Sequence, residues 1–135
     1  MSLTIRSWHL ANGLTIAVDD DTVNYYADYY NVHLSVRCQV VVKPEYLKAF
    51  KDNPRYDRAV ASLGLLTEYR REIVKAGVPG RDVAAVKEYL LQKFEETAVP
   101  YFEKEVFPER FVQKRFVEIM EELSKRNRFD DRNGD

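Results

Sequence analysis

The sequence predicts an α+β fold, in which an N-terminal antiparallel β-meander of at least three strands is packed on one face by three C-terminal amphipathic helices. Up to Pro44, apolar and polar residues alternate, as they do in strands with one buried face. From Asn53 onward, apolar residues recur at three- and four-residue steps, which is typical of amphipathic helices. Because each element has a single apolar side, we expect the helices to cover the apolar face of the sheet.

The first two strands are predicted as a hairpin from Ile5 to Asp19. A two-residue loop at Asn12-Gly13 would mix apolar and polar side chains on both faces. A three-residue loop, with Gly13 in the left-handed position, instead gathers the large apolar side chains on one face, so we favour it. It pairs Leu10 with Leu14, Trp8 with Ile16 and Arg6 with Val18.

The next strand is predicted from Val32 to Val42, where six apolar residues alternate with mostly polar ones until Pro44 ends it. Asp19-Asp20-Asp21 could bind a divalent cation, but its spacing is not that of a calcium loop, so we expect these residues to form a solvated turn before this strand. The stretch from Thr22 to Asn31 contains four tyrosines, and the pattern leaves a loop, a helical turn and a lead-in to the strand as alternatives.

Three helices are predicted in the rest of the chain. The first begins at Asn53-Pro54 and runs to about Ala76, where Gly77-Val78-Pro79 ends it. The second runs from about Gly80 to Ala98 and the third from about Pro108 to Lys125. A short turn is possible between residues 45 and 51.

Length and composition predict one globular domain. The chain has 135 residues, of which 45% are hydrophobic and 32% charged, and we assign residues 1–126 to the domain and 127–135 to a disordered polar tail. A single cysteine excludes an intramolecular disulfide and suits a reducing compartment. No signal peptide is visible, and no apolar run approaches the roughly 18 residues of a membrane span. We therefore expect a soluble cytoplasmic protein with no membrane contact.

The polar face of the sheet is the first candidate site. His9, His33 and Arg37 are expected there and could bind an anion or pair with another subunit, although a solvated face is the more common arrangement. Two histidines and an inward-facing Cys38 do not make a metal site, so neither a metal nor a cofactor is predicted. We interpret Cys38 as a buried structural thiol, because it alternates out of phase with His33.

Arg70 and the aromatic residues are the other candidates. Arg70 falls inside the apolar stripe of the first predicted helix, where it would pair with a carboxylate or bind an anion. The tyrosine-rich stretch contributes Tyr25 and Tyr29 as possible contact residues. Four aromatic residues near the junction of the last two helices suit either an interface or internal packing equally well. They are Tyr101, Phe102, Phe107 and Phe111.

The sequence contains no phosphate-binding loop, dinucleotide fingerprint, nucleophile elbow or zinc-protease motif, so an enzyme is disfavoured. Our first hypothesis is a non-catalytic interaction or regulatory module that self-associates as a homodimer, with a further protein partner left open. The second is a nucleic-acid-binding domain using tyrosines and arginines, which the net charge of -1 disfavours. The third is a small enzyme or anion-binding protein that uses His9, His33 and Arg37, or Arg70.

Overall fold

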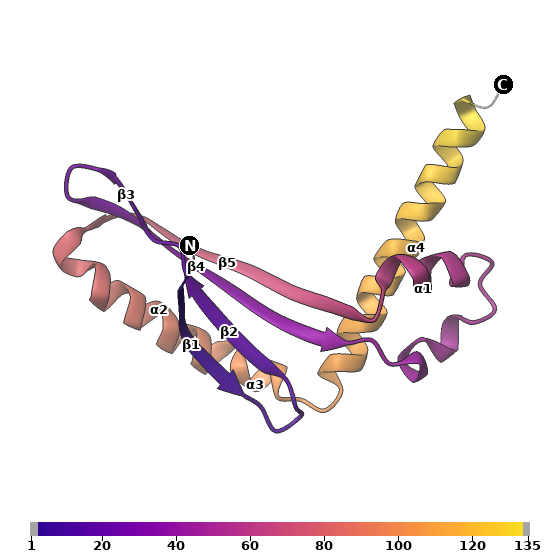
Figure 1. The fold of residues 1–135 in the computed structure, drawn as a ribbon, viewed down its shortest axis with the longest axis horizontal. Helices are drawn as coiled ribbons and strands as arrows, with labels where there is room; N and C mark the ends of the chain where they lie inside the picture. Colours follow the sequence, from indigo (N-terminus) through magenta and orange to yellow (C-terminus); the bar gives the residue numbers. More distant parts are fainter. Residues whose placement is uncertain (1–2, 134–135) are drawn as a thin grey trace. The chain divides into compact units, whose positions relative to one another are not determined.

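A computed structural model describes residues 3–133, with side chains as far as Arg126. The chain is an α+β protein, as predicted, with a five-stranded antiparallel sheet, one α-helix between its last two strands and further helices after the last strand (Figure 1). In chain order the elements are β1 (Leu3–His9), β2 (Thr15–Asp20), β3 (Val23–Tyr26), β4 (Tyr29–Val41), η1 (Pro44–Phe50), α1 (Tyr56–Leu63), β5 (Leu66–Pro79), η2 (Gly80–Asp82), α2 (Val83–Thr97), α3 (Val99–Phe102) and α4 (Phe107–Asn133).

The described chain divides into two compact units. One holds the residues up to Gln39 together with Glu68–Glu105, and the other holds Val40–Thr67 and the residues from Val106 on. The first unit contains most of the sheet with α2 and α3, and the second contains η1, α1 and α4. The assignment of residues 1–126 to a single domain stays a prediction.

The long strand β4 organises the sheet of the first unit. Along one edge it pairs with β2 through residues 34–38 and with β3 through residues 29–31, so β2 and β3 act as successive lengths of one partner. This leaves its other edge for β5, which also pairs with β4. The stretch from Thr22 to Asn31, left undecided by the sequence, is the hairpin that joins β3 to β4.

The hairpin β1–β2 has the predicted register. Trp8 pairs with Ile16 and Arg6 with Val18, and the amide of Leu10 donates to the carbonyl of Leu14 over 2.8 Å. Gly13 has a φ of +88°, the left-handed conformation expected at the end of the three-residue loop. The three-residue loop, which was predicted by requiring one apolar face, is therefore confirmed.

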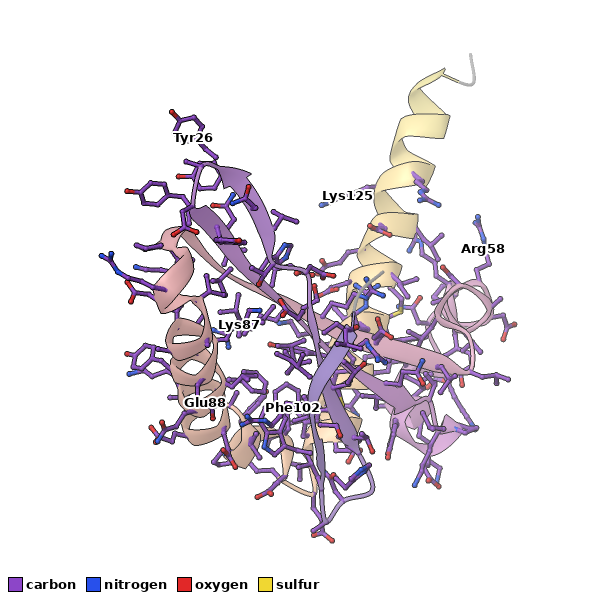
Figure 2. The ribbon with its side chains drawn as sticks, turned by 60° about the vertical axis from the view of Figure 1, so that its left-hand side comes forward. Tyr26, Arg58, Lys87, Glu88, Phe102 and Lys125 are labelled. Atoms are coloured by element: carbon purple, nitrogen blue, oxygen red, sulfur yellow. The ribbon has the colours of Figure 1, made fainter. Side chains whose placement is uncertain are left out.

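The apolar face of the sheet lies against α2, as Figure 1 and the side-chain contacts agree. Trp8 packs on Phe94 of α2 with ring centroids 5.5 Å apart. Lys87 points from α2 toward the sheet (Figure 2), and its Nζ lies 2.6 Å from Asp20 Oδ2. The alternation predicted for the long strand is confirmed, since its inward side chains have at most 1% of their surface exposed. These are Val32, Leu34, Val36, Cys38 and Val40.

The predicted helix from Asn53 to about Ala76 is wrong in its second half. The helix α1 ends at Leu63, because Gly64 leaves helical geometry with φ +79° and ψ −164°. The chain then returns as β5 and fills the free edge of β4. The edge of β4 is distant in sequence from residues 66–79. The local sequence pattern therefore could not show that these residues pair with β4 as a strand.

The other two predicted helices are confirmed as α2 and α4, although α4 continues past the predicted end at Lys125 to Asn133. The end of the predicted tail, residues 134–135, lies outside the described residues. In the second unit, Phe116 of α4 packs against Phe50 and Tyr56, with centroid distances of 5.2 and 5.8 Å. Within residues 3–133, no helix has both the length and the apolar composition needed to cross a membrane.

Candidate functional site

A cluster of polar side chains covers the face of the sheet opposite α2, within the first unit. We call it the polar cluster. Its residues come from β4, from β5 and from the last residues of β2 together with the residue that follows β2. In each strand the cluster residues are two positions apart, because side chains at i and i+2 share one face. The members are Asp19, Asp21, His33, Ser35, Arg37, Glu68, Arg70 and Glu72.

One oxygen of Glu72 is the centre of the cluster. His33 Nε2 lies 2.5 Å from Glu72 Oε2, and Ser35 Oγ lies 2.7 Å from the same atom. Ser35 Oγ is also 2.5 Å from Asp21 Oδ2. A hydroxyl has a single hydrogen, so Ser35 can satisfy only one of the two carboxylates as a donor at any moment.

The two arginines of the cluster are paired with carboxylates. Arg37 Nε donates to Asp19 Oδ2 over 2.9 Å, and Arg70 Nε donates to Glu68 Oε1. The carboxylate partner expected for Arg70 is therefore present, although Arg70 lies on a strand and not in the apolar stripe of a helix. Because each guanidinium faces a carboxylate, neither presents an unbalanced positive charge to an anion.

The carboxyl pKa values follow from these contacts. Hydrogen bonds from Arg37 and Thr4 hold the pKa of Asp19 below its usual 3.8. Hydrogen bonds from Ser35 and His33 lower the pKa of Glu72, while the nearby charge of Asp21 opposes that shift. Both carboxyls are therefore ionised at neutral pH, and Glu72 and Asp21 are close enough to repel each other.

The three consecutive aspartates do not form the solvated turn that we expected. Asp19 and Asp20 belong to β2, and Asp21 follows directly, with its amide donating to the His33 carbonyl over 2.8 Å. Side-chain alternation sends Asp19 and Asp21 to the polar cluster and Asp20 to Lys87 of α2. All three are partly buried.

A small hollow in the sheet face accompanies the cluster, with a volume of about 160 Å³. His33 and Glu72 both keep exposed surface, 36% and 49% of their side chains. Solutes therefore have access to the centre of the cluster. The hollow is lined by Asp19, Asp21, Ser35, Val36, Arg37, Arg70 and Glu72.

The tyrosine-rich segment forms a second exposed feature. Its strands β3 and β4 are joined by Ala27-Asp28, and Tyr26 projects from this tip (Figure 2). Four large side chains there have between 44% and 71% of their surface exposed. They are Val23, Tyr25, Tyr26 and Tyr29, and we call them the tyrosine hairpin.

The remaining candidates lie elsewhere. His9 is exposed at the end of β1, where its Nδ1 lies 3.0 Å from Thr15 Oγ1, and it takes no part in the polar cluster. Phe102 is buried in the first unit and Phe107 in the second, so both are core residues. Tyr101 is exposed and contacts Phe102 edge-on, and Phe111 stacks on Phe107 at 5.7 Å. Cys38 is buried, as predicted.

Sequence reasoning missed all four carboxylates of the polar cluster. Glu68 and Glu72 were assigned to a helix, and Asp19 and Asp21 to a solvated turn. The spacing of Glu68, Arg70 and Glu72 at every second position was the signal that could have revealed a strand with a polar face. Comparison with protein families, with curated proteins and with solved structures found no match to this chain.

Proposed function

We propose that this protein is a non-catalytic interaction module that self-associates as a homodimer through the tyrosine hairpin. The observation that supports the proposal is the exposure of Val23, Tyr25, Tyr26 and Tyr29 on a single projecting hairpin. Tyrosine supplies a large contact area with a polar hydroxyl and is enriched in protein interfaces. A group of large exposed side chains on one hairpin is a feature that often marks an interface.

The edge of the hairpin is open to another strand. Among the described residues, β3 pairs only with β4, so its outer backbone groups face away from the sheet. Proteins usually protect such an edge with lysine, proline or a short bulge. Residues 22–31 contain one charged residue, Asp28, and no proline, so the protection of this edge is limited to the shortness of β3, which has four residues, and a register shift near Tyr26. An edge with little protection suits pairing with a second copy about a two-fold axis.

The hairpin is held in one conformation before it meets a partner. Asn24 Nδ2 donates to the carbonyls of Ala27 and Tyr29, over 2.9 and 3.1 Å. The amide of Gly80 donates to the carbonyl of Asp28 over 2.8 Å and ties the turn to the end of β5. A preorganised hairpin loses less conformational entropy on association, which favours binding.

The two other hypotheses have less support. The tyrosines offer stacking surfaces for bases, but residues 22–31 include no lysine or arginine to contact phosphates. Anion binding at the polar cluster is disfavoured because Arg37 and Arg70 both face carboxylates.

Light scattering coupled to size exclusion tests the dimer. The monomer has a mass of 15.8 kDa, so a dimer should give about twice that value at micromolar concentrations. Val23→Lys places a charge on the open edge and Tyr26→Lys removes the most exposed ring, and each should shift the population toward monomer.

Tyr89→Lys is the matched control, because Tyr89 is a tyrosine of α2, outside the hairpin, and its exposed fraction of 61% lies between those of Tyr25 and Tyr26. It should leave the dimer intact. A wild-type mass of one chain at every concentration would refute the proposal. So would a dimer that Tyr89→Lys dissociates as readily as Val23→Lys.

A further inference from the structure

We propose that Asp21, His33 and Glu72 form a binding site for a divalent transition-metal ion, with zinc as the best match. The site lies in the polar cluster and is independent of the proposed dimerisation hairpin. It is defined by a position on each of three neighbouring segments of the sheet, following β2, in β4 and in β5.

The donor atoms are of the types that bind zinc. Two carboxylate oxygens and one imidazole nitrogen lie within 4.8 Å of one another. Imidazole favours zinc and other late transition metals over magnesium and calcium, which prefer oxygen ligands alone. Three protein ligands with one open position for water is the arrangement of zinc sites that bind or activate a further molecule.

The geometry needs only small side-chain movements. Tetrahedral zinc with ligands at about 2.0–2.1 Å places ligand atoms about 3.3 Å apart. His33 Nε2 and Glu72 Oε2, now 2.5 Å apart, would separate to admit the ion. Both side chains are partly exposed and have space to rotate, whereas β4 and β5 hold their backbones in register.

The charges of the cluster favour a cation at this place. Arg37 is matched by Asp19, and Arg70 by Glu68, so these pairs contribute little net charge. Asp21 and Glu72 place two carboxylates beside the same hydroxyl, that of Ser35. A metal ion would relieve their repulsion by binding one oxygen of each carboxylate, with His33 as the third ligand.

Calorimetric titration of the full chain with zinc chloride, and in parallel with magnesium chloride, tests the site. We expect one zinc per chain and no saturable magnesium binding. His33→Gln, Asp21→Asn and Glu72→Gln should each weaken zinc binding by about tenfold or more. The matched controls are His9→Gln, at the other histidine of the chain, and Glu95→Gln, at an exposed glutamate of α2, and both should bind as the wild type does.

A second measurement does not depend on the folding of variants. In nuclear magnetic resonance spectra of the wild-type protein, zinc should shift the ring signals of His33 and leave those of His9 unchanged. The proposal is overturned if zinc does not bind, if it shifts His9 instead of His33, or if His33→Gln binds zinc with unchanged affinity. Circular dichroism confirms that each variant is folded before its titration is interpreted.

Discussion

His33 Nε2 on β4 lies 2.5 Å from Glu72 Oε2 on β5, although the two residues are 39 positions apart in the sequence. Between them the chain leaves the sheet, forms η1 and α1, and returns along the free edge of β4. The contact therefore exists only because β5 pairs with β4. Any change that loosens this pairing should disturb the polar cluster before it disturbs the buried face beneath α2.

The ion pair between Arg37 and Asp19 should make stability depend on acidity. The pKa of Asp19 is lowered in the folded state, so the folded protein binds fewer protons than the unfolded chain. This contribution is complete above the usual pKa of 3.8 and is lost as pH falls through the lower folded-state value. Asp19→Asn should therefore show a shallower loss of stability than the wild type between about pH 6 and pH 3 in urea unfolding.

The control for this prediction is the same Asp19→Asn substitution in a protein from which the Arg37 guanidinium has been removed. If Arg37 causes the shift, Asp19→Asn should alter the acid dependence much less in an Arg37→Met background. Equal effects in both backgrounds would assign the pH dependence to another group.

Cys38 should be unreactive in the folded protein. Burial in the core raises the pKa of its thiol to about 11, so little thiolate is present near pH 8. Reaction with an aromatic disulfide reagent should be slow in buffer and fast in urea. The control is a protein in which Cys38→Ser removes the buried thiol and Ser62→Cys adds a thiol at an exposed position of α1. This exposed thiol should react at once in buffer. Prompt labelling of native Cys38 would show that this part of the sheet opens easily.

The β1–β2 hairpin and the core of β4 were predictable because their pairing is local and one face is buried. The requirement for one apolar face left one register for the β1–β2 hairpin, which the structure has. The alternation of Val32, Leu34 and Val36 predicted which side chains of β4 face inward, and these are buried. The two later helices were predictable from their own apolar stripes.

The strand β5 was not predictable by the same reasoning. Leu66, Ile73 and Val74 suit a helical stripe, and the pairing edge that makes them a strand is supplied by distant residues. Because this segment was predicted as a helix, Glu72 was not predicted as a member of the polar cluster. Arg70 was found, but for the wrong reason, since a charged residue in a helical stripe is unexpected whereas one on an open strand face is ordinary.

Gly64 should be irreplaceable at the junction of α1 and β5. Its φ of +79° with ψ of −164° lies in a region that is essentially restricted to glycine, although a side chain would have space there. Gly64→Ala and Gly64→Asn should each lower the free energy of unfolding by about 1–3 kcal/mol in urea titrations. Leu65→Ala, at the exposed neighbouring residue, should change it by less than about 0.5 kcal/mol. A neutral Gly64→Ala would mean that the junction relaxes without strain.

One core phenylalanine in each unit can decide whether the chain unfolds as a single domain. Phe102 is buried beside Phe94 and Tyr69 in the first unit, and Phe116 is buried beside Phe50 and Tyr56 in the second. Replacing either by alanine should cost about 3–5 kcal/mol. If residues 1–126 form one cooperative domain, both variants lower the same single transition in differential scanning calorimetry. Two transitions, of which Phe102→Ala lowers one and Phe116→Ala the other, would instead make the two units separate folding domains.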